Sequence, residues 1–292
     1  MKNILLHLRL PFSYFLLPIF IFGMAQSAHI DIFNSIILFI SLHFFIYPAS
    51  NAYNSYMDKD IGSIGGLKNP PPVSRGVYLA SIFLDIIGLL MVAMINIKMI
   101  LFIIVYISVS KAYSWRKIRL KKYSITGWLA VIIFQGGYTF LLVNMACENN
   151  FTLSWFTLQK IDGMLLSTML IGAYYPLTQI YQHDDDNLRG DITISYRLGI
   201  KGTFIFSAIM FLISFVIAYN YFVKYFDSYQ FYIFGLCLIP AIIYFLYWFI
   251  KAIHNKKAAD FTHTMRMTFL SSTCLLIIFM ILFYLNHFSK SI

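Results

Sequence analysis

The sequence predicts an all-α membrane protein with nine transmembrane helices, arranged as two parallel four-helix repeats plus a ninth helix. Composition, the spacing of apolar runs and the placement of charge support this prediction. Of 292 residues, 60% are apolar and 12% are charged, whereas soluble domains average about 25% charged residues. A soluble globule with so little charge would expose large apolar patches. The composition therefore excludes a soluble enzyme, a disordered chain and a fibrous repeat.

Nine apolar runs follow one another along the chain. Each is long enough to cross about 30 Å of hydrocarbon as a helix. The longest breaks between them, 58–76 and 184–201, are too short to fold separately, so we take residues 1–292 as a single integral membrane domain. The expected spans are residues 10–27, 33–53, 77–97, 99–115, 124–146, 162–183, 202–222, 229–250 and 267–288.

The distribution of Lys and Arg predicts the orientation. If the nine spans alternate, 18 of the 22 Lys and Arg residues fall on the side of the N-terminus and four on the other. Such an excess is typical of the cytoplasmic side. We therefore expect a cytoplasmic N-terminus, an external C-terminus and a location in the inner cell membrane. The clean split also supports nine spans, because a missed or false helix would scramble it.

Acidic residues are concentrated where the second and sixth spans end. Of the 12 Asp and Glu residues, six lie in these two connections. In the first acidic segment (residues 51–62), Asn51, Asn54 and Asp58 lie on one face of a helix, about one turn apart. Acids weaken the excess of positive charge that sets the orientation in the membrane. We therefore expect these acids to have another role.

The second acidic segment (residues 179–193) repeats the pattern. Gln182 and Asp186 are spaced by four residues, Gln179 continues the stripe, and Gly190 is expected to end the helix. Because the second and sixth spans are four apart, both segments fall on the same side of the membrane. This placement indicates a parallel repeat of spans 1–4 and 5–8.

The residue types in these segments suit a hard cation. Asp184, Asp185 and Asp186 repel one another unless a cation neutralises them. Carboxylate and amide oxygens suit Mg²⁺, which commonly binds through a few carboxylates plus substrate phosphates. Two such segments facing each other would hold Mg²⁺ and a diphosphate. A second interpretation stays open, in which both are solvated loop acids beside a basic membrane face.

A basic stretch precedes the fifth span, at residues 113–122. It is either a topology determinant that contacts anionic lipid or a source of positive charge for a diphosphate leaving group, through Arg119 or Lys121. Within the spans, Asp85 and His43 are costly at membrane depth. They are expected to pair with neighbouring helices or to line an internal cavity.

With these segments the chain resembles the UbiA-type intramembrane prenyltransferases. That family has nine helices and two aspartate-rich motifs, after helices 2 and 6, and the resemblance extends over about residues 10–285. The first motif, N-D-x-x-D-x-x-x-D, corresponds here to Asn54, Ser55, Asp58 and Gly62.

The other two matching segments follow in the family's order. The second motif, D-x-D/E-x-D-x-x-x-G-x-x-T, corresponds to Gln182, Asp184, Asp186, Gly190 and Thr193. A Y-S-x-x-x-hydrophobic-R-L-K segment before helix 5 corresponds to Tyr113, Ser114, Ile118, Arg119, Leu120 and Lys121.

Three motif acids are replaced. Ser55 and Gly62 stand in place of two acids of the first motif, and Gln182 replaces the opening Asp of the second. Lys68, followed by Asn-Pro-Pro-Pro, stands where the family often has Arg-Pro. Asp60, Asp184 and Asp185 are nearby carboxylates that offer compensation, and the Gln182 side chain still presents a carbonyl oxygen.

The resemblance implies Mg²⁺-dependent transfer of an isoprenoid chain from a prenyl diphosphate to an aromatic or lipid-pathway acceptor within the membrane. The partners are then the diphosphate, the acceptor and the lipid bilayer, with no nucleic acid. It also implies roles for residues: metal ligands Asn54, Asp58, Gln182, Asp184 and Asp186; proton-accepting carboxylates Asp58 and Asp186; diphosphate contacts Lys68, Tyr113, Arg119 and Lys121; and substrate-pocket residues Asn51, Gln179 and Asp85.

Two alternatives remain open. A transporter would favour acids near the bilayer midplane and broken helices there, whereas here the acids crowd one face. A catalytically inactive homologue, acting as a lipid-binding or scaffold protein, is supported by the replaced motif acids.

Overall fold

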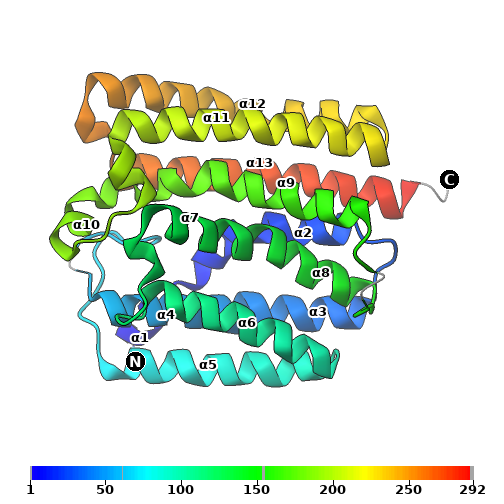
Figure 1. Ribbon diagram of the computed structural model, residues 1–292, viewed down its shortest axis with the longest axis horizontal. Helices are drawn as coiled ribbons and strands as arrows, with labels where there is room; N and C mark the ends of the chain where they lie inside the picture. The colour runs from blue at the N-terminus through cyan, green and yellow to red at the C-terminus, as the bar shows by residue number, and fades with distance from the viewer. Residues whose placement is uncertain (1, 61, 153–154, 290–292) are drawn as a thin grey trace.

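The structure, a computed structural model, describes residues 2–60, 62–152 and 155–289 as long helices that run side by side (Figure 1). Within these residues, eight helical stretches are long and apolar enough to cross a membrane. A ninth is made of α9 (Leu158–Tyr174), which continues directly into the 3-10 helix η6 (Tyr175–Gln182). Together these two are also long enough to span. The predicted all-α membrane fold is confirmed.

The first four stretches are formed by α1 (Lys2–Leu8), η1 (Leu10–Leu16) and α2 (Leu17–Ala25); α3 (Ile32–Ile40), η2 (Ser41–Ile46) and α4 (Tyr47–Asp58); α5 (Arg75–Ala93); and α6 (Ile97–Ser114). Two of these four stretches contain an internal segment of another helix type, the 3-10 helix η1 in the first and the π-helix η2 in the second.

The later stretches follow after the short 3-10 helix η3 (Leu120–Lys122). The fifth consists of α7 (Ser124–Ile132), the π-helix η4 (Ile133–Tyr138) and α8 (Thr139–Cys147). The sixth, α9 with η6, leads into the short helix α10 (His183–Arg189), and α11 (Ile194–Tyr225), α12 (Ser228–His254), η7 (Lys256–Ala258) and α13 (Phe261–His287) complete the chain.

Two large apolar clusters form the interior, and the first and fifth stretches contribute to both. One cluster gathers side chains from the first five stretches, with Phe20 of α2 and Leu142 of α8 fully buried. The other joins the first stretch to the fifth through ninth, with Phe22 of α2 and Phe140 of α8 at its centre. The two stretches thus hold the halves of the molecule together by burying large apolar side chains on two faces.

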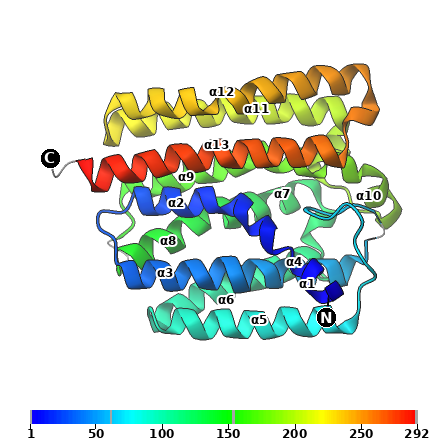
Figure 2. The same ribbon diagram turned by 180° about the vertical axis from the view of Figure 1, so that it is seen from behind.

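All the connections that carry the predicted site lie at one end of the bundle, which we call the site end. The helices α1 and α10 and the connection between α4 and α5 lie there, whereas α13 ends at the opposite end (Figures 1 and 2). Helix ends place the candidate residues. Lys59 takes a left-handed conformation and ends α4 directly after Asp58, and left-handed Gly190 ends α10 as expected.

The fifth and sixth stretches approach each other closely at Gly136 of η4. A Cβ atom on this residue would lie 2.7 Å from the backbone carbonyl oxygen of Ser167 in α9. Only a glycine permits this contact between two backbones. The close approach sets the distance between α7 and α9, both of which lead towards the site end.

Candidate functional site

A cavity of about 140 Å³ at the site end is lined by both acidic segments. The first acidic segment contributes Asn54 and Asp58 from the end of α4 and Asp60 from the connection after it. The second contributes Gln182 and Asp186. We call it the polar cavity. The structure therefore brings together the two segments that the sequence placed on one side of the membrane.

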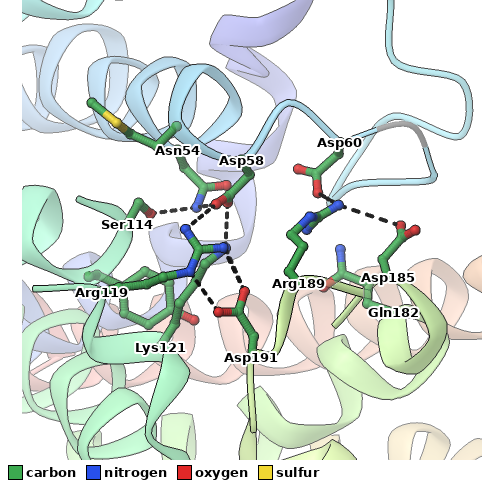
Figure 3. A network of polar contacts seen from close by, with 12 residues as sticks. Asn54, Asp58, Asp60, Ser114, Arg119, Lys121, Gln182, Asp185, Arg189 and Asp191 are labelled. Carbon is green, nitrogen blue, oxygen red and sulfur yellow. Dashed lines mark hydrogen bonds and ion pairs between the residues drawn. The ribbon is translucent and has the colours of Figure 1, made fainter. Parts of the chain in front are cut away.

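Asp58 is held by two cations from the basic stretch before α7 (Figure 3). Its Oδ2 atom accepts hydrogen bonds from Lys121 Nζ at 2.5 Å and from Asn54 Nδ2 at 2.9 Å. Arg119 Nη1 lies 3.3 Å from Oδ1. Hydrogen bonds between ionised groups are stronger than neutral ones, so this carboxylate has a fixed position.

The same cations reach the second acidic segment through Asp191, which is fully buried. Arg119 donates from Nε at 2.6 Å and from Nη2 at 2.8 Å to the two carboxylate oxygens of Asp191. Burial alone would lower the pKa of Arg119, but Asp191 and Asp58 outweigh it and the pKa is raised. Arg119 therefore bridges the two acidic segments as a permanent cation.

A second cationic bridge lies beside the first (Figure 3). Arg189 forms an ion pair with Asp60 and lies 4.0 Å from Asp185. Burial raises the pKa of Asp60, with a further rise from Asp58, while Arg189 opposes the shift. The Asp185 carboxylate also fills the space beside Gly62, where a Cβ atom would lie only 2.2 Å from its Oδ2 atom. A carboxylate of the second segment thus lies where the first segment lacks a side chain.

Asp186 is the buried carboxylate of the second segment. Its Oδ2 atom accepts a hydrogen bond from Thr193 Oγ1 at 2.8 Å. Burial raises the pKa of Asp186 to about 6. A carboxyl group with a pKa in this range exchanges protons near neutral pH.

A second cavity, of about 170 Å³, continues from the polar cavity into the bundle. We call it the inner cavity. The two cavities share Arg9, Asn54, Tyr113 and Tyr175. The hydroxyl groups of Tyr113 and Tyr175 are hydrogen-bonded to each other where the two cavities meet. Asn51, predicted as a pocket residue, lines the inner cavity.

Arg9 is a site residue that the sequence analysis treated only as a topology charge. It lines both cavities and is mostly buried. It donates hydrogen bonds to the carbonyl oxygens of Asn51 at 3.0 Å and Gly65 at 3.2 Å, and it takes a left-handed backbone conformation with φ 48°. No carboxylate among the described residues forms an ion pair with it. An Arg at the start of an apolar run is an ordinary topology signal, so the sequence position of Arg9 gave no sign of a role at the site.

Four predicted residues line neither cavity, and Arg119, described above, is one of them. Asp184 is exposed on α10 and lines neither cavity, and Lys68 is exposed in an open groove beside α13. Asp85 of α5 pairs with Lys111 of α6 at 2.7 Å and lines neither cavity. Pairing with a neighbouring helix was one of the two expectations for Asp85, and it is the one the structure shows.

The donors at the polar cavity fit a metal that is shared with a substrate. Within the described ranges, no three His, Cys, Asp or Glu side chains converge on one metal position. Asp58 and Asp186 face one cavity, together with the amide of Gln182. The side-chain oxygen Oε1 of Gln179, in the same wall, is buried and has no hydrogen-bond partner among the described residues. Mg²⁺ typically binds one or two carboxylates plus substrate phosphates rather than an all-protein cage, so this donor set suits it.

Comparison with models of protein families identifies the family of this chain. A profile of the UbiA prenyltransferase family matches residues 15–273. Comparison with curated proteins gives no significant match.

Several solved structures have the same fold. A UbiA homologue from Archaeoglobus fulgidus bound to GPP and Mg²⁺ superposes with a TM-score of 0.68 at 16% identity, covering 96% of this chain and 99% of that one. The apo structure of a UbiA homologue from Aeropyrum pernix K1 gives 0.68 at 13% identity, with 96% and 98% covered. A digeranylgeranylglyceryl phosphate synthase gives 0.60 at 19% identity, with 96% and 97% covered.

Proposed function

Because the chain belongs to the UbiA prenyltransferase family, we propose that it transfers an isoprenoid chain from a prenyl diphosphate to an acceptor within the membrane, with Mg²⁺ as cofactor. The polar cavity carries this proposal, since carboxylates of both acidic segments meet basic side chains there. The related protein that binds GPP and Mg²⁺ supports the same substrate class.

Basic side chains around the polar cavity are proposed to bind the diphosphate. Lys121, Arg189 and Arg9 line the cavity, and Arg119 contacts Asp58 beside it. Charge-assisted hydrogen bonds to phosphate oxygens are among the strongest in proteins. The Tyr113 hydroxyl adds a neutral donor at the cavity wall.

Lys68 is proposed to act earlier, as an external contact for the diphosphate. It lies in the groove beside α13, which shares Met265 with the polar cavity.

Oxygen atoms of both acidic segments are proposed to hold Mg²⁺. The candidates are Asp58 and Asn54 from one segment and Asp186 and Gln182 from the other, with the unpartnered Gln179 carbonyl oxygen as an addition. When bound, the cation would stabilise the negative charge on the departing diphosphate. Asp184 is exposed on α10. It is proposed as a ligand only for a state in which α10 has rotated about its axis towards the polar cavity.

The proposed reaction breaks one bond and forms one. The bond between the allylic carbon and the diphosphate oxygen breaks, and its electron pair leaves with the diphosphate. The allylic carbon then bonds to a nucleophilic atom of the acceptor, which loses a proton. Asp186 is proposed to accept that proton, because its carboxyl group lines the polar cavity.

The first test is turnover in purified membranes. Labelled allylic diphosphates of several lengths would be supplied with and without Mg²⁺, and diphosphate release and label transfer followed. Mg²⁺-dependent release is expected, with a loss of roughly 100-fold in Asp58→Asn. Asp162→Asn is the matched control, since Asp162 pairs with Lys224 at the opposite end of the bundle. Equal activity with and without Mg²⁺, or full activity in Asp58→Asn, would contradict the proposal.

The inactive-homologue alternative rests on Ser55, Gly62 and Gln182. Asp185 lies beside Gly62, and Gln182 still lines the polar cavity. These positions support an active site with a rearranged set of acids. The transporter alternative has no comparable support, because Asp85, an acid near the middle of a span, is paired with Lys111.

A further inference from the structure

An open groove at the site end lies on the outside of the bundle, beside α13. It is bounded by α13, by the later part of α12 and by the connection that follows α4. We call it the α13 groove. Among its described lining residues, only Met265 also lines the polar cavity, and none lines the inner cavity. Its lining includes Lys68, Tyr244, Phe261, Arg266, Phe269 and Leu270.

The α13 groove contains two cations without an acidic partner. Lys68 and Arg266 are both exposed, and within the described ranges neither forms an ion pair with a carboxylate. Asp260, the acid that precedes α13, caps this helix instead and accepts a hydrogen bond from its backbone at 2.8 Å. The two positive charges are therefore open to an anion from outside the chain.

Apolar side chains continue the groove below its cations. Because α13 begins at Phe261 at the site end and runs into the bundle, Phe269 and Leu270 lie about one turn deeper than Arg266, on the same helix face. The difference in depth is about 6 Å. Phe269 is 58% exposed, so in a spanning helix its ring contacts hydrocarbon. Positive charge thus lies directly above an apolar wall.

The connection between α12 and α13 adds positive charge beside the groove. Lys251, Lys256 and Lys257 are all exposed there. Basic side chains close to a membrane surface attract anionic lipids, and each one adds to the attraction. These lysines therefore raise the concentration of anionic lipid around the groove, and the groove itself supplies a site with a defined shape.

The two parts of the groove together select the class of ligand. An Arg guanidinium group and a Lys ammonium group both bind phosphate oxygens. A free phosphate ion would leave the Phe269 ring and Leu270 without a contact. A neutral lipid would leave Lys68 and Arg266 without a counter-charge. A phosphate group attached to a hydrocarbon chain matches both parts.

We infer that the α13 groove binds an anionic phospholipid of the surrounding bilayer. The phosphate group lies between Lys68 and Arg266, and one acyl chain follows Phe269 and Leu270 into the hydrocarbon. A prenyl diphosphate also combines a phosphate with a chain, so the earlier contact proposed for Lys68 makes it a competitor for the same groove. Binding of the phospholipid needs neither Mg²⁺ nor turnover, so this inference and the proposed function can fail independently.

The test measures lipid retention by the purified full-length protein in detergent, using native mass spectrometry. The probes are phosphatidylglycerol and phosphatidylcholine with identical acyl chains, supplied without Mg²⁺ and without prenyl diphosphate. The protein is expected to retain phosphatidylglycerol at least about tenfold more strongly than phosphatidylcholine. Equal retention of the two lipids overturns the inference.

A matched pair of double variants locates the site. Lys68→Gln combined with Arg266→Gln is expected to lower retention of phosphatidylglycerol to the level of phosphatidylcholine. Lys98→Gln combined with Lys224→Gln removes two exposed cations at the opposite end and is expected to keep the preference. All four side chains are exposed, so neither double variant disturbs the packed interior. Equal loss in both double variants, or no loss in the first, overturns the inference.

Two further measurements distinguish a lipid from a free phosphate ion. Phe269→Gln keeps both cations and is expected to weaken retention of phosphatidylglycerol about tenfold, since it removes the apolar contact. Inorganic phosphate at the same concentration as the lipid is expected to leave retention unchanged. Unchanged retention in Phe269→Gln, or displacement of the lipid by inorganic phosphate, overturns the inference of a lipid site.

Discussion

Gly62 lacks the acidic side chain of the family motif, and the structure shows that this leaves space for another side chain. The first motif of the resembling family has an acid at this position. Here a Cβ atom would lie 2.2 Å from the Asp185 carboxylate, and Arg189 lies between Asp185 and Asp60. An acid from the second segment has taken the space of a missing acid in the first.

This arrangement predicts a reciprocal effect of mutation. Gly62→Asp is expected to displace the Asp185 carboxylate, because the new side chain overlaps it and two adjacent carboxylates repel each other. Stability is expected to fall by about 1 kcal/mol or less, and Mg²⁺-dependent turnover is expected to fall. Adding Asp185→Gly is expected to restore both. Thermal unfolding and turnover of the two single variants and the double variant form the measurement. A double variant that behaves as the sum of two independent losses would show that the two positions do not share one space.

At the residue scale, the sequence predicted the site residues that recur with helical spacing. It did not predict the site residues that are held there by contacts with other segments. Asn54, Asp58 and Asp186 lie on predicted helix faces, and all three line the polar cavity. Arg9 and Arg189 line it too. The partners of Arg9 are far away in sequence, and so is Asp60, the closer of the two acids beside Arg189. Contacts between distant segments leave no local periodicity, so these two could not be singled out.

At the element scale, the apolar runs predicted where helices lie but not how they change type. The third span was expected at 77–97, and α5 covers Arg75–Ala93. The π-helices η2 and η4 and the 3-10 helix η6 have no signature in hydropathy, because an apolar run does not specify the hydrogen-bond register. These irregular turns occur beside the site: Gln135 belongs to η4, and Gln179 belongs to η6.

Substitution of Gly136 tests whether the close approach of the fifth and sixth stretches stabilises the fold. Gly136→Ala is expected to destabilise the fold by about 1–3 kcal/mol, since its Cβ atom would meet the Ser167 backbone, which cannot rotate away. Gly235→Ala in α12 is the control, because its Cβ atom would lie 3.4 Å from the Phe215 ring, an ordinary contact. Unfolding in detergent, followed by circular dichroism, compares the two. Equal stability of both variants would mean that the helices separate at no cost.

At the scale of the whole molecule, the site end carries the basic and acidic connections, and α13 ends at the opposite end (Figure 2). The excess of Lys and Arg predicts that the site end faces the cytoplasm. This orientation is a proposal, and it determines from which side a diphosphate reaches the polar cavity.

Two cysteine positions test the orientation. Leu188 on α10 is 84% exposed at the site end, and Leu158 at the start of α9 is 59% exposed at the other. Each would be changed to Cys after replacing Cys147, Cys237 and Cys274. In intact cells, a membrane-impermeant thiol reagent is expected to label Leu158→Cys and not Leu188→Cys, and the pattern should reverse in inside-out vesicles. Labelling of Leu188→Cys in intact cells would show that the site end faces outwards, which contradicts the proposed orientation.

The central claim is that both acidic segments act together on one diphosphate. The most direct measurement replaces Mg²⁺ by paramagnetic Mn²⁺ and follows the phosphorus relaxation of a bound, non-reactive prenyl diphosphate analogue. The account predicts strong relaxation in the unmodified protein and its loss in both Asp58→Asn and Asp186→Asn, since each segment supplies a carboxylate to the polar cavity. Relaxation that survives either substitution would contradict the account, because a single segment would then hold the metal and the diphosphate alone.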